Sequence, residues 1–365
     1  MLLLIFLSLF VNPTPAQARN YDLYRSDRRF KGGFCSAIGG ACAADDDLVT
    51  GIFENPASLA TGRADWDFDG DYSTHIAPEG DSADATDRSI QSGILGAGYS
   101  TGDFGFGAGV SADVDKADAV SSVIDADGNV QRLRAQERTS SFQVHVPFGV
   151  AVTTALSLGA ALTVSHTRQL IAEADNDGPA DNAVSGYSLG VSLGALYTYS
   201  PRLRFGTWYR FPTHLYDTLH LTTSPPATVV NYKEDFAFHN PWLWALGAQI
   251  GLGEENRLYL ELDVIGSTRD AFLYSFTTFS AAPNETRLRR KGRDIVLEPH
   301  VGFRTPLGRG FRLHTGSYYE NTRVYGAANR LHGTVGISAA VFDKLEIIGG
   351  VDVSRNYQQL IFTFR

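Results

Sequence analysis

The residues whose types and spacing come nearest to a chemical site are the acids of the run Asp65-Trp66-Asp67-Phe68-Asp69-Gly70. This run matches the opening of a calcium-binding loop, in which the twelfth residue should be a bidentate Glu. The twelfth residue here is Ile76. Strict alternation of acidic and aromatic residues is instead typical of a β-strand with one polar and one apolar face. We therefore expect Asp65, Asp67 and Asp69 to line a polar interior without binding a metal ion.

Serine and histidine residues give the next candidates. The pattern G-x-S-x-G, which marks the nucleophile of many hydrolases, surrounds Ser100, Ser188 and Ser192. A hydrolase needs this serine in a strand–turn–helix context, whereas Ser188 and Ser192 lie within a strand-like segment. His145, His214 and His332 are not spaced like metal ligands. We expect no catalytic residue, no cofactor and no metal, and an outer-membrane esterase is kept only as an alternative.

The two cysteines, Cys35 and Cys42, are separated by six residues. Residues 1–18 have the form of a signal peptide, with an apolar stretch over Met1–Val11 and a cleavage site at Ala16-Gln17-Ala18. An exported chain folds in an oxidising compartment, so we predict a disulfide between the two cysteines. Two buried free thiols are the alternative.

The composition restricts the elements that can position these residues. The 365 residues are 43% hydrophobic and 12% aromatic, yet the longest apolar run, Leu2–Val11, has only ten residues. A membrane-spanning helix needs about 20, so a bundle of spanning helices is excluded. The net charge of −9 argues against a nucleic-acid partner.

After residue 60 the chain alternates with a period of two. Residues 187–199 place Tyr, Leu, Val or Ala at every odd position, and mainly Gly, Ser or Thr at the even positions. The same pattern recurs in 104–111, 242–250, 258–264 and 331–341. This alternation predicts strands with one large apolar face throughout.

We predict fourteen strands, near 63–76, 88–100, 103–116, 138–153, 155–171, 184–199, 202–220, 232–252, 256–274, 290–305, 310–321, 330–342, 344–354 and 357–365. The connections after odd-numbered strands are mostly long and those after even-numbered strands are short, as in outer-membrane barrels. The prediction is an all-β fold, a 14-stranded antiparallel transmembrane β-barrel in the bacterial outer membrane. A soluble sandwich or propeller would not segregate its loop lengths. The last hairpin is the weakest part of the pattern and leaves 12 strands as the alternative count.

A barrel of this size has an interior that something must fill. Residues 19–60 are not strand-like and hold both cysteines, the acids at 45–47 and many small apolar residues. We predict that 19–60 form an N-terminal plug (hatch) and that 61–365 form the barrel, with a disordered periplasmic tail as the alternative. Besides the three aspartates, Arg210, Glu261 and Asp263 are expected to face the lumen.

Residues 43–60, AADDDLVTGIFENPASLA, resemble the N-terminal signature of the outer-membrane long-chain fatty acid transporter family (FadL/TodX type). Trp208-Tyr209-Arg210-Phe211-Pro212 and the segment 240–263 resemble later parts of that family in the same order. The resemblance implies a fourteen-stranded barrel with an N-terminal hatch, often with a lateral opening for hydrophobic molecules. It makes Asn55, Pro56 and Ala57 candidates for the hatch or gate. Residues 34–42 and the terminal Arg365 depart from the family pattern.

Two functions follow as expectations. The first is passive uptake of hydrophobic small molecules such as long-chain fatty acids. The alternative is a secretion-associated shuttle or scaffold without channel activity, because PorV-type barrels also carry an Asn-Pro-Ala box. Expected partners are the hydrophobic ligand, outer-membrane lipid and lipopolysaccharide, and under the alternative a periplasmic or secretion partner. Basic residues that could contact lipopolysaccharide phosphates are Arg287, Arg289, Arg290, Lys291 and Arg293.

Overall fold

The computed structural model describes residues 32–61, 65–75, 87–124, 130–175, 178–223, 230–267, 272–278, 284–289, 294–321, 329–342, 345–354 and 357–365. The predicted signal peptide (1–18) and the first part of the predicted plug (19–31) lie outside these residues. Within the described residues, no helix is long and apolar enough to cross a membrane.

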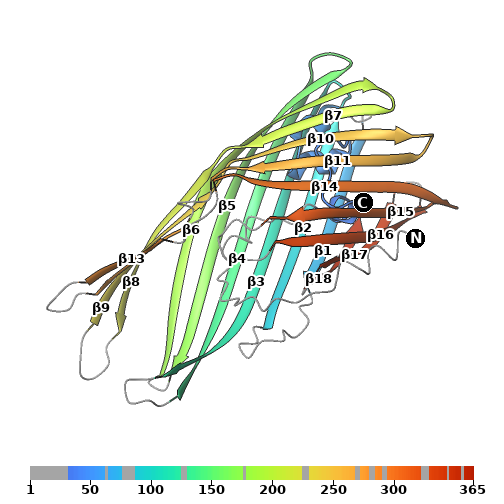
Figure 1. Cartoon of the computed structure of the whole chain (residues 1–365). Coiled ribbons are helices and arrows are strands. Elements are labelled where there is room, and N and C mark those ends of the chain that lie inside the picture. The colour runs from blue at the N-terminus through green and yellow to red at the C-terminus, as the bar shows by residue number, and fades with distance from the viewer. Residues whose placement is uncertain are drawn as a thin grey trace.

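Fourteen antiparallel strands close into one barrel (Figure 1). In barrel order they are β1 (Asp65–His75), β2 (Asp87–Ser100), β3 (Phe104–Ile124), β4 (Val130–Ala151), β5 (Leu156–Asp175), β6 (Gly178–Ser200), β7 (Leu203–Arg210), β10 (Leu243–Leu252), β11 (Asn256–Ile265), β14 (Val296–Gly308), β15 (Phe311–Glu320), β16 (Arg330–Phe342), β17 (Leu345–Ser354) and β18 (Tyr357–Phe364). Pairing of β18 with both β17 and β1 closes the sheet, so the predicted last hairpin and the count of 14 are confirmed. Closure satisfies the backbone groups that an open edge would expose to lipid.

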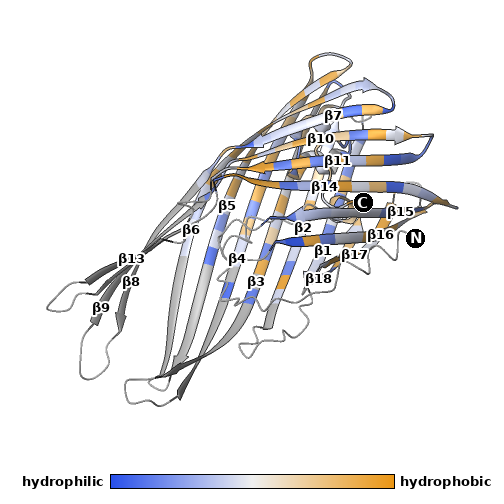
Figure 2. Ribbon diagram, in the orientation of Figure 1, coloured by the Kyte–Doolittle hydropathy of each residue, from blue (hydrophilic) through white to orange (hydrophobic). Residues whose placement is uncertain are grey.

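The period-two pattern separates the two faces of the wall. On β1, Trp66 and Phe68 are 54% and 62% exposed, whereas Asp69 and Asp71 are 6% and 5% exposed. Figure 2 shows the same alternation of hydrophobic and hydrophilic residues along other strands. Large apolar side chains therefore form the outer surface, where lipid takes the place of water.

Four of the predicted strands are broken, which corrects the predictions for 202–220, 232–252, 256–274 and 290–305. Their outer parts are β8 (Thr213–Thr223), β9 (Val230–Asn240), β12 (Phe272–Thr278) and β13 (Asn284–Arg289), which form a separate four-stranded sheet in the order β13-β12-β9-β8. Pro212 and Pro241 stand at two of the breaks, where a proline removes a ladder donor. Figure 1 shows this sheet projecting from the wall of the barrel.

Two predicted outer loops, 117–137 and 172–183, are largely strand. The β3–β4 ladder continues to Ile124↔Val130, and the β5–β6 ladder continues to Asp175↔Gly178. The sequence there does not alternate clearly, which is why it predicted loops. Pairing with the neighbouring strand nevertheless continues the hydrogen-bond ladder.

Among the described residues before the barrel, 32–61, there are three short helices: α2 (Gly33–Ala37), α3 (Leu48–Phe53) and the 3₁₀ helix η2 (Pro56–Ala60). They lie inside the ring of strands (Figure 1). We call residues 32–61 the luminal segment.

Candidate functional site

The luminal segment fits against glycines on the inner face of the wall. A Cβ atom added at Gly206 would overlap the backbone of Ala43, one at Gly302 would overlap Ile38, and one at Gly159 would overlap Pro56. Similar overlaps would arise between a Cβ at Gly105 and Leu59, a Cβ at Gly194 and Asn55, and a Cβ at Gly316 and Gly39. The inward glycines thus make a surface on which this backbone can lie in direct contact.

A disulfide joins Cys35 and Cys42 at one end of the luminal segment. The turn inside this loop contains Gly39 and Gly40, with φ of 69° and 77°, a left-handed conformation that favours glycine. A side chain at Gly39 would also meet the wall, since its Cβ would lie 2.8 Å from the Ser317 nitrogen. The loop packs in an apolar cluster that comprises Phe34, Cys35, Ala37, Ile38, Ala41, Cys42, Tyr259 and Ile348.

The Asn-Pro-Ala box holds the other end of the luminal segment. The Asn55 side chain accepts a hydrogen bond from the Ala57 nitrogen at 3.2 Å and thereby caps η2. Its amide nitrogen donates to the carbonyl oxygens of Ala43 at 2.7 Å and Ala195 at 3.1 Å. Pro56 occupies the first position of η2, where no backbone donor is needed. The box therefore links two parts of the luminal segment to strand β6; its role as a gate stays a prediction.

The acidic run at 45–47 meets arginines and a glutamine of the barrel. Asp46 forms an ion pair with Arg204 at 2.6 Å, and Asp47 forms one with the terminal Arg365. Asp45 accepts a hydrogen bond from the Gln249 amide at 3.2 Å. Burial, together with the negative charges of Asp46 and Asp47, raises the pKa of Asp45 to about 7. Arg365 thus contacts the luminal segment through Asp47.

The candidates predicted to face the lumen occupy two parts of the wall. On β1, Asp65 is exposed, Asp67 is half-buried and Asp69 is buried. Arg210 on β7 and the pair Glu261 and Asp263 on β11 are all buried. The Ala43 backbone nitrogen donates to the Glu261 carboxylate at 2.6 Å, so this residue contacts the luminal segment directly. The structure does not bring the β1 acids and the β11 acids into one site.

A polar network that the sequence did not predict continues from β11 across β14, β15, β16 and β17. The Asp263 carboxylate lies 3.4 Å from the His300 ring, which stacks on Tyr318 with ring centres 5.4 Å apart. The opposite face of Tyr318 stacks on His332 at 4.2 Å. The two ring nitrogens of His332 lie 3.0 Å from Asp352 and 2.7 Å from Glu320. Alternation could have placed each of these residues on the inner face, but not beside one another.

An apolar cluster lies on the inner face where the wall divides, beside the buried side chains of Arg210, Asp263 and Glu298. This buried cluster lies at the ends of β7, β10, β11 and β14 that adjoin the break. It consists of Trp208, Leu243, Ala245, Ile265 and Val296, together with Ala43 of the luminal segment. Around the same break Tyr209 stacks on Trp242 with ring centres 6.0 Å apart and meets Phe211 edge-on at 4.9 Å. Apolar residues thus line the wall at the point where its strands separate.

Ser188 and His145, two residues of the motifs set aside in the sequence, have polar neighbours on the described part of the wall. The Ser188 hydroxyl lies 2.5 Å from that of Ser165. His145 hydrogen-bonds Ser111 at 3.3 Å and Thr163 at 3.1 Å. The side chains of His214 and of the basic residues at 287–293 lie outside the described part of the molecule.

Solved structures of two toluene transporters and of a FadL homologue share this fold. The chain is similar to the crystal structure of the Pseudomonas putida toluene transporter TodX, with a TM-score of 0.72 and 14% identity over 91% of this chain and 97% of that chain. It is also similar to the Ralstonia pickettii toluene transporter TbuX, with a TM-score of 0.65 and 16% identity over 91% and 96% of the two chains. A FadL homologue of Pseudomonas aeruginosa gives a TM-score of 0.62 and 10% identity over 92% and 97%.

At the level of the fold, the expected likeness to FadL/TodX-type barrels is confirmed, and the predicted outer-membrane location agrees with it. No family model matches the sequence. A search of curated proteins found no match either.

Proposed function

We propose that this protein is an outer-membrane channel for the passive uptake of hydrophobic small molecules, and that its cargo leaves the lumen sideways through the divided wall. The observation that carries the proposal is the coincidence of the wall break with the inward apolar cluster of Trp208, Leu243, Ala245, Ile265 and Val296. The toluene transporters of the same fold support the class of cargo.

The wall break lies between β6 and the separate sheet. The β6–β7 ladder ends at Ser192↔Arg210, and one further bond joins the Phe211 nitrogen to the Val191 oxygen at 3.0 Å. Within the described residues, β6 residues 178–191 have a ladder with β5 alone. A hydrophobic molecule that passes here would leave the apolar cluster directly for lipid. Its path runs beside the buried polar side chains of Arg210, Asp263 and Glu298.

A polar substitution at Leu243 tests this route. Leu243→Asn places an amide in the apolar cluster, so uptake of labelled toluene or of a labelled long-chain fatty acid should fall several-fold in cells that depend on this protein. Ile94→Asn is the matched control, because Ile94 is also inward and buried but lies on β2, where the ladders on both sides are continuous.

Equal loss of uptake in the two variants would contradict the lateral route. Unchanged uptake of both compounds on deletion of the gene, together with co-purification of a secretion partner, would favour the shuttle or scaffold instead. Comparison of the two labelled compounds shows whether fatty acids or monoaromatic hydrocarbons are the better substrate.

A further inference from the structure

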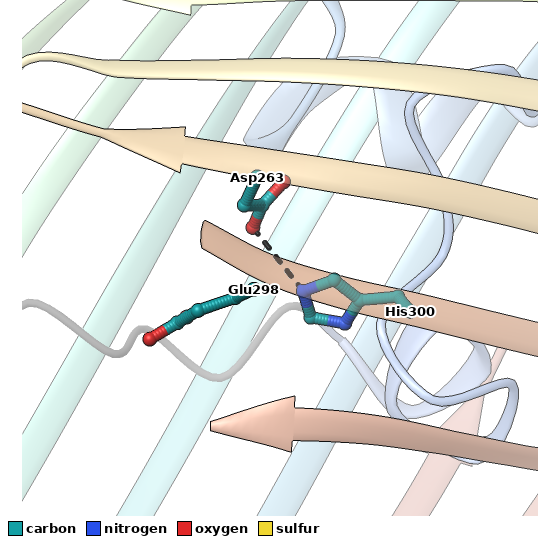
Figure 3. Close-up of side chains that lie close together, drawn as sticks. All are labelled: Asp263, Glu298 and His300. Carbon is teal, nitrogen blue, oxygen red and sulfur yellow. Dashed lines mark ion pairs between the residues drawn. The ribbon is translucent and has the colours of Figure 1, made fainter. Parts of the chain in front are cut away.

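Three side chains that can bind a metal ion meet on the inner face of the wall: Asp263 on β11, and Glu298 and His300 on β14 (Figure 3). Asp263 lies directly across from Glu298 in the β11–β14 register, and His300 is two residues further along β14. All three are buried, and one ligand atom from each lies within 4.8 Å of the others. No metal site was expected from the sequence, in which Glu298 and His300 lie 35 and 37 positions after Asp263.

The luminal segment determines which nitrogen of His300 carries a proton. The His300 Nδ1 atom lies 2.7 Å from the carbonyl oxygen of Gly39, which can only accept, so Nδ1 must donate. In the neutral ring the other nitrogen, Nε2, then presents a lone pair. Nε2 lies 3.4 Å from the Asp263 Oδ2 atom, which is also electron-rich. A positive species between these two atoms would hold them together.

The 3.4 Å distance between His300 Nε2 and Asp263 Oδ2 favours a metal ion over a shared proton. Charge-assisted N–H···O hydrogen bonds measure about 2.7–2.9 Å. Two ligands that each lie about 2.0–2.2 Å from a tetrahedral zinc ion are separated by about 3.4 Å. His332 provides the comparison within this protein, since its nitrogens lie 3.0 and 2.7 Å from the carboxylates of Asp352 and Glu320. The His332 distances are those of hydrogen bonds, whereas the longer His300–Asp263 distance matches the separation of two ligands on one ion.

We propose that Asp263, Glu298 and His300 bind a divalent transition-metal ion of the Zn²⁺ type. An imidazole ligand disfavours Mg²⁺ and Ca²⁺, which prefer oxygen ligands. The bond from Nδ1 to the Gly39 carbonyl is the outer-shell contact that orients metal-binding histidines in other proteins. Rotation of the Glu298 side chain completes three protein ligands, and water takes the fourth position.

The ion would act as a structural clamp. It would join β11 to β14 close to Ile265↔Val296, the last pair before the wall divides. Through His300 and Gly39 it would also fix the disulfide loop of the luminal segment to the same part of the wall. Metal binding would therefore stabilise the pairing of β11 with β14 next to the wall break. It would also stabilise the docking of the luminal segment.

The test uses the full-length protein in mild detergent, prepared without a histidine tag. After treatment with a chelator, Zn²⁺ alone is titrated and the bound ion is measured by elemental mass spectrometry after gel filtration. We expect one ion per chain. Loss of an outer-shell contact already costs about 10–100-fold in metal affinity, so Asp263→Asn and His300→Gln should each weaken binding by at least about 100-fold. His332→Gln is the matched control and should keep the ion.

A second measurement needs no variant and so remains decisive if a substituted barrel fails to fold. X-ray absorption of the zinc-loaded wild-type protein should show one imidazole nitrogen, further oxygen ligands and no sulfur. Failure of the wild-type protein to retain zinc, a ligand set without imidazole, or zinc binding that survives in His300→Gln and is lost in His332→Gln would each overturn the proposal.

Discussion

At the scale of single residues, Asp45 makes docking of the luminal segment depend on pH. Its carboxyl is buried beside Asp46 and Asp47 and is opposed by Arg304 and Arg365, and its pKa is raised to about 7 from an ordinary value near 3.8. At a pH between about 4 and 7, the Asp45 carboxyl is therefore protonated in the docked segment and ionised in the undocked segment. The contribution of Asp45 to the stability of docking is therefore fully present below about pH 4 and is lost as the pH rises through about 7.

Asp45→Asn replaces the protonated carboxyl by a neutral amide and should remove this dependence. Amide hydrogen exchange of residues 43–53, corrected for intrinsic rates, should be slower at pH 5 than at pH 8 in the wild-type protein. In the variant the two corrected rates should agree. A wild-type protein with equal protection at both pH values would show that Asp45 does not govern docking.

At the scale of elements, the inner faces of the strands are shaped to receive a backbone. Gly206 on β7 lies against Ala43, so Gly206→Ala should displace the luminal segment and raise the single-channel conductance of the purified barrel. Gly349 on β17 has open space around the position of a Cβ, so Gly349→Ala should leave conductance unchanged. The same rise in both variants would point to a general loosening of strands and not to contact with the segment.

At the scale of the whole molecule, the luminal segment is attached to many separate parts of the barrel. It contacts β6 through Asn55, β7 through Asp46, β11 through Ala43, β14 through Gly39 and the C-terminus through Asp47. Contacts distributed in this way around the ring suit a segment that restricts the lumen. This restriction is our proposal.

Removal of the segment tests the proposal directly. A protein lacking residues 19–54 should fold as a barrel, because every barrel strand begins after residue 60, and should show much larger, non-selective conductance in planar bilayers. A folded barrel with wild-type conductance would refute the plug.

Much of this architecture could be predicted from the sequence because it depends on local rules. A strand at a lipid surface must alternate with a period of two, and Trp66 and Asp69 reveal their faces without knowledge of any partner. The strand breaks were harder to predict. Pro212 and Pro241 mark two of them, yet alternation continues on both sides of each break.

The sequence by itself determined the all-β class and the face on which Glu261 and Asp263 lie, whereas the choice between 12 and 14 strands needed the pairing of β18 with β1 and β17. The tertiary structure alone decided which inward side chains meet, because the register between strands fixes which residues lie across from one another. Thus Asp263 joins Glu298 and His300, and His332 joins Glu320 and Asp352. It also decided which glycines face the luminal segment, since those contacts join residues that are far apart in the sequence and arise only when the ring closes around the segment.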